Sequence, residues 1–594
     1  MSSKSNAFIL FLALAVALSF PSTCPIAQRS IYLAAVTGED TGGVFQMHVE
    51  VGPGNGTIYT SINPETGFAT QQSEEAAAAY AFSSTGIDRN SCDVLYSMSG
   101  DFGNSTVDGP SAGGAIAIAT RAALLNRTIR QDTVMTGTIS SDGKVGAVGG
   151  IIEKGKGAAD AGAKYFILPK PEIYESVLLS SISRSRNFHA IDVENLSEAE
   201  AILFSNYSQN FSSKFVPESK PAPALPQIKM DADLGRFALV AQKVVGDLQL
   251  KVSQAYPPGS AGADTSNFSG YFTKEVAKYD SLIPQGYVFT AANSAFLLSI
   301  DVEYAKIGDS GVDLTGSIDD VSKCVAALPQ TYKTKENMQW AIGADLRRLW
   351  AQEKLNQTLA ARSGQDGYTT LQDLLFVKSW CGISSDLSSQ ASEIGGTKVN
   401  ESALAALSSK ELLSAKESFS GSKKQDYDAL WHLQNAEDAN ASGEYGAAIY
   451  ESAYARIMQD ASSESVENVT SASESLMNET RSSLWGKIYA GQGAYLFYDD
   501  KSSGFSPDGA YTILKYAQEL DRVSAEIDST AANPPQNVSQ APSAPAQSSG
   551  QTPAQCVSQP ILEQLLTAAF LLLLIAFSLF SIRKAAGGKT GMVK

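Results

Sequence analysis

Histidine is scarce in this chain of 594 residues, with only His48, His189 and His432. That scarcity limits both zinc sites and acid–base catalysis by imidazole. Cysteine is also sparse: there are five, and no two form a C-x-x-C pair. The sequence therefore predicts neither a zinc knuckle nor a thioredoxin-like redox site, and we expect no metal.

An excess of positive charge and a nucleotide-binding loop are also missing. The chain has 45 Lys and Arg against 62 Asp and Glu, a formal net charge of −17. Such an acidic chain repels nucleic acid, so we expect no DNA or RNA partner. No G-x-x-x-x-G-K-[ST] motif occurs, so we expect no ATP and no other cofactor.

Two apolar segments frame the chain. Ala7–Phe20 follows Lys4 and is typical of a signal-peptide core, with Ala27 the best candidate before the cut, or of an uncleaved signal anchor. Near the other end, the uncharged Leu565–Ile582 has the length of a membrane span, the alternative being a buried core helix. Basic residues follow it, which predicts a cytoplasmic C-terminus and a body outside the cell, anchored in the cell membrane.

N-x-[ST] sequons are frequent, thirteen where about four would occur by chance. Their excess indicates a glycosylated extracellular surface. The sequon asparagines are Asn55, Asn104, Asn126, Asn195, Asn206, Asn210, Asn267, Asn356, Asn400, Asn440, Asn468, Asn478 and Asn537.

Pattern and composition divide the chain. We expect an α+β domain over 28–212, because Gly-rich alternating strand patterns there are mixed with a few helices. Two strands are expected, over Thr133–Ser140 and Lys144–Val148, around a hairpin turn at 141–143. The remaining segments are a signal peptide or anchor (1–27), a Pro-rich linker (213–228), a helical domain (229–530), a disordered Pro/Ser/Gln stalk (531–560), a transmembrane helix (561–582) and a basic tail (583–594).

The helical domain is predicted to be irregular. Asp426–Ala461 has the pattern of a helical hairpin with a turn at 442–445 like those of tetratricopeptide repeats, yet no 34-residue period is evident. Cys324 and Cys381 lie in this domain and could form a disulfide outside the cell.

A serine stands at the start of a predicted helix in the segment Asp108–Gly114 (DGPSAGG). Backbone N–H groups and the helix dipole at such a position can stabilise an oxyanion beside Ser111. Two other interpretations of the motif remain open. Ser111 could simply be a helix cap, or G-x-S-x-G could be the nucleophile elbow of an α/β-hydrolase, with His189 as its histidine.

A lysine in the first turn of a later helix is the second signal. Gly149-Gly150-Ile-Ile-Glu-Lys154 opens that helix, and the dipole there disfavours a cation. That field and burial would lower the pKa of Lys154, so that the neutral amine can take a proton from a serine hydroxyl. Lys156 is the weaker candidate, because two residues along a helix point in nearly opposite directions.

Three ordered motifs resemble the proteolytic domain of Lon proteases: DGPSAGGAIA, MTGTI, and GKVGAVGGIIEKGKGAADAGAKYFILP. The resemblance, over Gly38–Pro169, implies Ser111 as nucleophile and Lys154 as base, 43 residues apart. It implies that Thr136 hydrogen-bonds the lysine and that Asp108 is the acidic residue before G-P-S. Ala112 of the P-S-A-G element and Gly150 of the G-G turn are supporting residues.

The resemblance implies a function as well. The chain looks like the archaeal membrane-anchored Lon-like peptidases, which lack an ATPase domain. We therefore expect an ATP-independent serine endopeptidase that cleaves unfolded or flexible proteins at the outer membrane face, in six-membered rings if it assembles as the family does. The alternatives are an inactive scaffold of the same fold and a peptidase limited to self-processing. The segment Gly308-Asp309-Ser310-Gly311 is similar to a chymotrypsin-like serine motif, but we interpret it as a loop in the helical region.

Overall fold

The computed structural model describes residues 24–38, 41–100, 106–212, 218–257, 263–307, 312–362, 367–420, 425–463 and 467–532. Most of the predicted signal segment, most of the stalk, the Leu565–Ile582 span, the basic tail and the 308–311 loop lie outside these residues. Within the described part, none of the helices has the length and apolar character needed to cross a bilayer.

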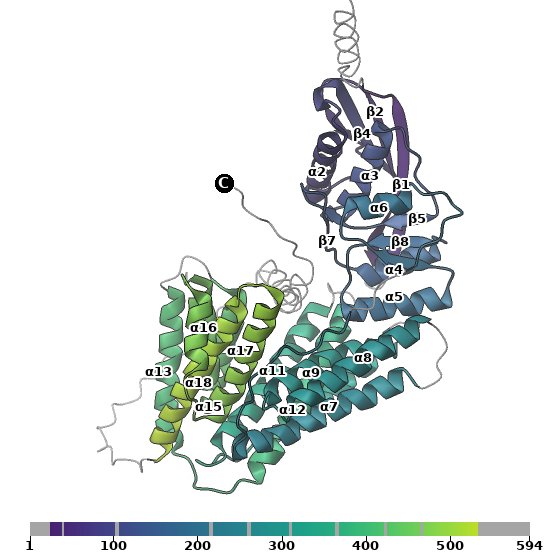
Figure 1. The fold of residues 1–594 in the computed structure, drawn as a ribbon. Helices are drawn as coiled ribbons and strands as arrows, with labels where there is room; N and C mark the ends of the chain where they lie inside the picture. The colour runs from purple at the N-terminus through teal and green to yellow at the C-terminus, as the bar shows by residue number, and fades with distance from the viewer. Residues whose placement is uncertain are drawn as a thin grey trace, which may run out of the picture.

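A seven-stranded mixed sheet forms the centre of the N-terminal domain (Figure 1). Its order is β3-β4-β2-β1-β5-β8-β9. The four strands β1, β5, β8 and β9 are parallel to one another. β2 is antiparallel to both β1 and β4. The strands are β1 (Ala27–Gly38), β2 (Thr41–Pro53), β3 (Ile58–Thr60), β4 (Cys92–Ser99), β5 (Thr133–Met135), β8 (Tyr165–Leu168) and β9 (His189–Asp192).

Helices cover both faces of this sheet, because successive strand side chains point to opposite sides. Tyr165 and Ile167 join the core under α2 (Phe68–Thr85), α3 (Gly113–Leu124) and α6 (Leu196–Leu203). Phe166 and Leu168 join the opposite core, under α4 (Ile151–Asp160) and α5 (Ile173–Ser185). Because helices connect the parallel strands and cover both faces, the domain is α/β, which corrects the predicted α+β class.

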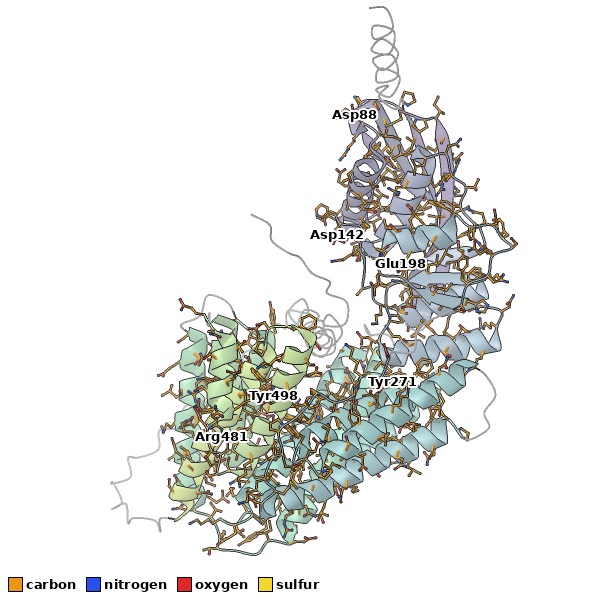
Figure 2. The ribbon with its side chains drawn as sticks, in the orientation of Figure 1. Asp88, Asp142, Glu198, Tyr271, Arg481 and Tyr498 are labelled. Atoms are coloured by element: carbon orange, nitrogen blue, oxygen red, sulfur yellow. A yellow bond between two sulfur atoms is a disulfide. The ribbon has the colours of Figure 1, made fainter. Side chains whose placement is uncertain are left out.

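The single strand predicted over Thr133–Ser140 is wrong. β5 ends at Met135, and Gly137 has φ 152°, a conformation that favours glycine. The chain then leaves the sheet and forms a separate hairpin of β6 (Thr138–Ile139) and β7 (Val145–Gly146), which confirms the predicted hairpin turn at 141–143, although both strands are shorter than expected. Asp142 stands in the turn of that hairpin (Figure 2).

The region after 230 is entirely helical in its described residues apart from short connections, as predicted. The predicted helical hairpin is present as α14 (Tyr427–Ala441) and α15 (Tyr445–Ser463), joined by a turn in which Gly443 has φ 80°. The helices are α7 (Ala232–Ala255), α8 (Ala263–Leu282), α9 (Val288–Tyr304), α10 (Leu314–Ala326), α11 (Met338–Ala361), α12 (Gly367–Ser392), α13 (Glu401–Ser420), α14 (Tyr427–Ala441), α15 (Tyr445–Ser463), α16 (Val469–Met477), α17 (Leu484–Ser503) and α18 (Asp508–Ala532).

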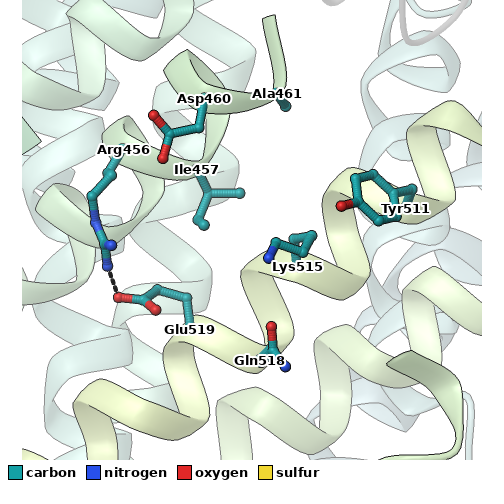
Figure 3. Close-up of a pocket in the computed structure, with 8 residues that line it drawn as sticks. All are labelled: Arg456, Ile457, Asp460, Ala461, Tyr511, Lys515, Gln518 and Glu519. Atoms are coloured by element: carbon teal, nitrogen blue, oxygen red, sulfur yellow. Dashed lines mark hydrogen bonds and ion pairs between the residues drawn. The ribbon is translucent and has the colours of Figure 1, made fainter. Parts of the chain in front are cut away.

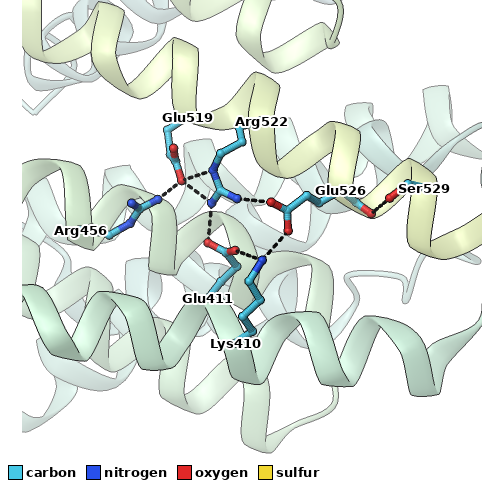
Figure 4. Close-up of polar contacts among 7 residues, drawn as sticks. All are labelled: Lys410, Glu411, Arg456, Glu519, Arg522, Glu526 and Ser529. Carbon is cyan, nitrogen blue, oxygen red and sulfur yellow. Dashed lines mark hydrogen bonds and ion pairs between the residues drawn. The ribbon is translucent and has the colours of Figure 1, made fainter.

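Ion pairs tie the last helices together (Figure 4). Arg522 of α18 binds Glu411 of α13 at 2.6 Å and Glu519 of its own helix at 2.5 Å. Arg456 of α15 also pairs with Glu519. Glu519 thus links α15 to α18, and Arg522 links α18 to α13.

Two disulfides are present in the described residues. Cys324–Cys381 joins α10 to α12, which confirms the predicted pair. Cys24–Cys92 joins the residues before β1 to the start of β4 and was not predicted. A bridge in each domain is typical of proteins that fold in oxidising compartments.

Candidate active site

Ser111 lies in a short 3-10 turn, Pro110–Ala112, that leads directly into α3. Gly109 before it has φ 135°, so a side chain there would be strained. The Ser111 side chain is half-buried, and Ala112 is the N-cap residue of α3. The turn therefore presents the hydroxyl at a helix start, as the sequence predicted.

The first turn of α2 holds this loop in place. The Asp108 carboxylate accepts hydrogen bonds from the backbone N–H groups of Ala69 (3.0 Å) and Thr70 (3.2 Å). The Ser73 hydroxyl donates to the carbonyl of Pro110 at 3.3 Å. Asp108 thus acts as a cap for α2 and fixes the approach to Ser111, a contact that the sequence did not indicate.

The Met-Thr-Gly segment supports Ser111 from the other side. The N–H of Gly137 and the hydroxyl of Thr136 both donate to the Ser111 carbonyl, at 2.7 and 3.3 Å. The carbonyl of Gly137 accepts from the N–H of Gly114 at 2.9 Å. Thr136 is fully buried. Its hydroxyl binds the backbone at Ser111, whereas the resemblance implied a bond to Lys154.

Lys154 belongs to the first turns of α4, which lies directly on the β1–β2 hairpin. Gly150, the residue before the helix, has φ 66°, and a Cβ there would lie 2.3 Å from Cγ2 of Val36. A Cβ on Gly42 would lie 2.1 Å from the carbonyl oxygen of Glu153. Only glycine fits at both positions, and the close approach leaves Lys154 4% exposed.

Burial sets the protonation of this lysine. It lowers the pKa of Lys154 to about 8, while the charges of Glu153 and Glu175 oppose the shift. Burial also raises the pKa of Glu175 on α5 to about 8. The Lys154 ammonium donates to the carbonyl of Gly149 at 2.8 Å. A substantial fraction of Lys154 is therefore neutral at mildly alkaline pH.

The topology brings Ser111 and Lys154 to the same edge of the sheet. Thr136 and Gly137, which hold Ser111, follow the end of β5, and Val36, against Gly150, is near the end of β1. β1 and β5 are parallel neighbours, so both motifs lie at the carboxyl edge, where α/β domains commonly place their sites. The contacts of the described residues include no hydrogen bond between Ser111 and Lys154.

The other candidates lie elsewhere. His189 begins β9 and pairs with Tyr165, the first residue of β8, so it lies at the amino edge of the parallel strands. That placement argues against a hydrolase elbow with His189 as partner of Ser111. The Lys156 ammonium lies 4.8 Å from the ring centre of Tyr368 on α12. It therefore contacts a different part of the chain from the Lys154 ammonium, which binds the Gly149 carbonyl.

One further concave feature is distant from these residues in the chain. A cavity of about 480 Å³ lies between α15 and α18, with Arg456, Lys515 and Glu519 among its lining (Figure 3). None of the predicted site residues lines it. Among the described residues, no group of three His, Cys, Asp or Glu side chains could hold a metal ion.

Comparison with known proteins gives a family match for the N-terminal domain. Residues 43–198 match the family model described as Lon protease (S16) C-terminal proteolytic domain. Lon protease 2 of Herpetosiphon aurantiacus is 31% identical over 173 residues, which cover 28% of this chain and 21% of that protein. The Lon protease of Phenylobacterium zucineum is 51% identical over 67 residues, which cover 11% of this chain and 8% of that protein.

The matched part of the chain thus spans about a fifth of the length of the first of these relatives. The family match ends at residue 198, so it does not include the helical region. The similarity to the proteolytic domain of Lon proteases is therefore confined to the N-terminal domain of this chain.

Proposed function

We propose that this chain is an ATP-independent serine endopeptidase in which Ser111 is the nucleophile and Lys154 the general base. The observation that carries the proposal is the placement of a buried lysine, with a pKa of about 8, at the same sheet edge as a serine that begins a helix. A buried neutral amine can activate a hydroxyl without a histidine.

The reaction proceeds in two steps. The Ser111 Oγ attacks the peptide carbonyl carbon, and its proton passes to the Lys154 Nζ, which leaves the Gly149 carbonyl to receive it. Collapse of the tetrahedral intermediate breaks the C–N bond, and Lys154 returns the proton to the leaving amine. Water, deprotonated by Lys154, then attacks the acyl-enzyme carbonyl, the C–O bond to Ser111 breaks, and Lys154 returns the proton to the Ser111 Oγ. Backbone N–H groups near Ala112 stabilise the oxyanion.

The proposed location is the outer face of the cell membrane, in an archaeal protein anchored by Leu565–Ile582. Two disulfides support an oxidising compartment. None of the sequon asparagines among the described residues is buried, so each could carry a glycan. The proposed substrates are unfolded or flexible proteins, because the proposed activity uses no ATP to unfold them. The proposed assembly is a ring of six, by resemblance to Lon domains.

Cleavage of an unfolded casein-like protein by the purified full-length chain tests the proposal. Ser111→Ala and Lys154→Met should each abolish cleavage, and added Mg·ATP should not change the wild-type rate. Ser141→Ala is the matched control, because Ser141 is an exposed serine of the same domain. Equal rates for wild type and Ser111→Ala would refute the proposal and favour an inactive scaffold.

Self-processing is the narrower candidate. In that case the wild-type chain would lose its membrane anchor by one cut, Lys154→Met would keep it, and neither would degrade casein. Comparison of the membrane-bound sizes of the two proteins separates this outcome from general proteolysis.

A further inference from the structure

Helix α5 of the N-terminal domain packs on the helical region (Figure 1). Val177 and Leu178 of α5 belong to one hydrophobic core with residues of α7 and α9. Across the same contact, the rings of Tyr174 on α5 and Tyr304 on α9 lie 4.8 Å apart between centres. Tyr271 of α8 also packs against this core (Figure 2). The two parts of the chain are therefore joined by a buried apolar interface.

A second contact reaches the helix that carries Lys154. Lys156, half-buried on α4, lies 4.8 Å from the ring centre of Tyr368, in the first turn of α12. The hydroxyl of Tyr304 donates to the carbonyl of Tyr368 at 2.9 Å, and both tyrosines are buried. α9 thus holds Tyr368 in position, and Tyr368 holds the ammonium of Lys156 by a cation–π contact.

Helix α4 depends on such neighbours. It has ten residues and two interior glycines, Gly155 and Gly157. Each interior glycine costs about 1 kcal/mol relative to alanine, and a helix this short is marginal by itself. The glycines permit close approach instead: a Cβ on Gly155 would lie 2.7 Å from Leu179 of α5, and one on Gly157 would lie 2.5 Å from Gly42. Tertiary contacts therefore set the position of α4.

We propose that the helical region is a positioning element of the peptidase site, and that Tyr368 and Lys156 fix α4 so that Lys154 stays buried at the sheet edge. This inference rests on the proposed function in that Lys154 is the base. Lys156 and Tyr368 are positioning residues and touch no substrate. The two carboxyl groups whose charges act on Lys154 are Glu153 on its own helix and Glu175 on α5, and neither is altered when Lys156 is changed.

The test measures the Lys154 amine directly. Full-length chain labelled with ¹³C-lysine is titrated by NMR, the Lys154 signal being assigned from its loss in Lys154→Met. In Lys156→Met, α4 loosens and water reaches Lys154, so the midpoint should rise by about one unit from its wild-type value. Labelling of Ser111 by a serine-directed acylating probe at pH 7.5 should fall about fivefold or more. Lys156→Arg, which keeps the cation over the ring, should restore both.

Lys501→Met is the matched control, because Lys501 makes the same kind of contact with Phe497 on α17 at 5.5 Å. It should leave the Lys154 midpoint unchanged. If Lys156→Met does not fold, Tyr304→Phe takes its place, since that change removes only the hydroxyl that holds Tyr368. An unmoved midpoint in a folded variant would overturn the positioning role. A moved midpoint in a chain whose Ser111 never reacts would instead refute the proposed function and leave the positioning role standing.

Discussion

Replacing Lys154 with methionine should make the N-terminal domain more stable at neutral pH while abolishing activity. Lys154 is 4% exposed, and burial lowers its pKa from 10.5 to about 8. Between these two values the unfolded chain binds a proton that the folded domain does not. The free energy of unfolding of the wild type therefore rises with pH across that window.

The magnitude follows from the shift. A displacement of about 2.5 pKa units corresponds to about 3 kcal/mol of destabilisation at pH 7, because each unit is worth about 1.4 kcal/mol. At pH 10 the folded lysine is fully neutral and about a quarter of the unfolded lysine has lost its proton, so about 1 kcal/mol of the destabilisation remains. The stability difference between Lys154→Met and wild type should thus be larger at pH 7 than at pH 10 by about 2 kcal/mol.

Pulse proteolysis in urea measures this stability difference, with the amount of intact N-terminal domain as the readout. All five tryptophans lie at residues 340–485, so their fluorescence reports the helical region and serves as an internal reference. Lys229→Met, which changes an exposed lysine, should show no such pH dependence. A difference between Lys154→Met and wild type that is constant from pH 7 to pH 10 would refute the reasoning.

Three further predictions follow from single contacts. Asp108→Ala should lower the free energy of unfolding by about 1 kcal/mol, through loss of the cap on α2, and slow Ser111 acylation about tenfold, measured by urea denaturation and probe labelling. Gly150→Ala should destabilise by about 2 kcal/mol, and Val36→Ala in the same chain should recover part of that, because the new Cβ meets Val36. Cys324→Ser with Cys381→Ser should lower the thermal midpoint of the helical region, since a 57-residue loop closure is worth about 4 kcal/mol in the chain-entropy model.

Much of the N-terminal domain was readable from local patterns. Alternation predicted strands in this domain, and glycine-rich turns located the starts of α3 and α4. Ser111 and Lys154 therefore lie near helix starts, as expected. The break at Gly137 was missed because Thr133–Ser140 reads locally as one strand. Only the pairing of β6 with β7 shows that the chain leaves the sheet there.

Long-range contacts were beyond the sequence pattern. Nothing in the surroundings of Cys24 and Cys92 indicated that they pair across 68 residues. The resemblance implied that the Thr136 hydroxyl binds Lys154, whereas in the structure it donates to the Ser111 carbonyl. The approach of Tyr368 to Lys156 depends on how α5 and α9 pack, and such packing has no signature in either segment alone.

The pH dependence of Ser111 acylation tests the central claim most directly. If Lys154 is the base, the rate of labelling by a serine-directed probe should rise about tenfold from pH 7 to pH 9, with a midpoint near 8, as the neutral fraction of the amine increases. Mass spectrometry should place the adduct on Ser111 in the wild type and find none in Lys154→Met. An adduct on another residue, or a wild-type rate at Ser111 in Lys154→Met, would contradict the account.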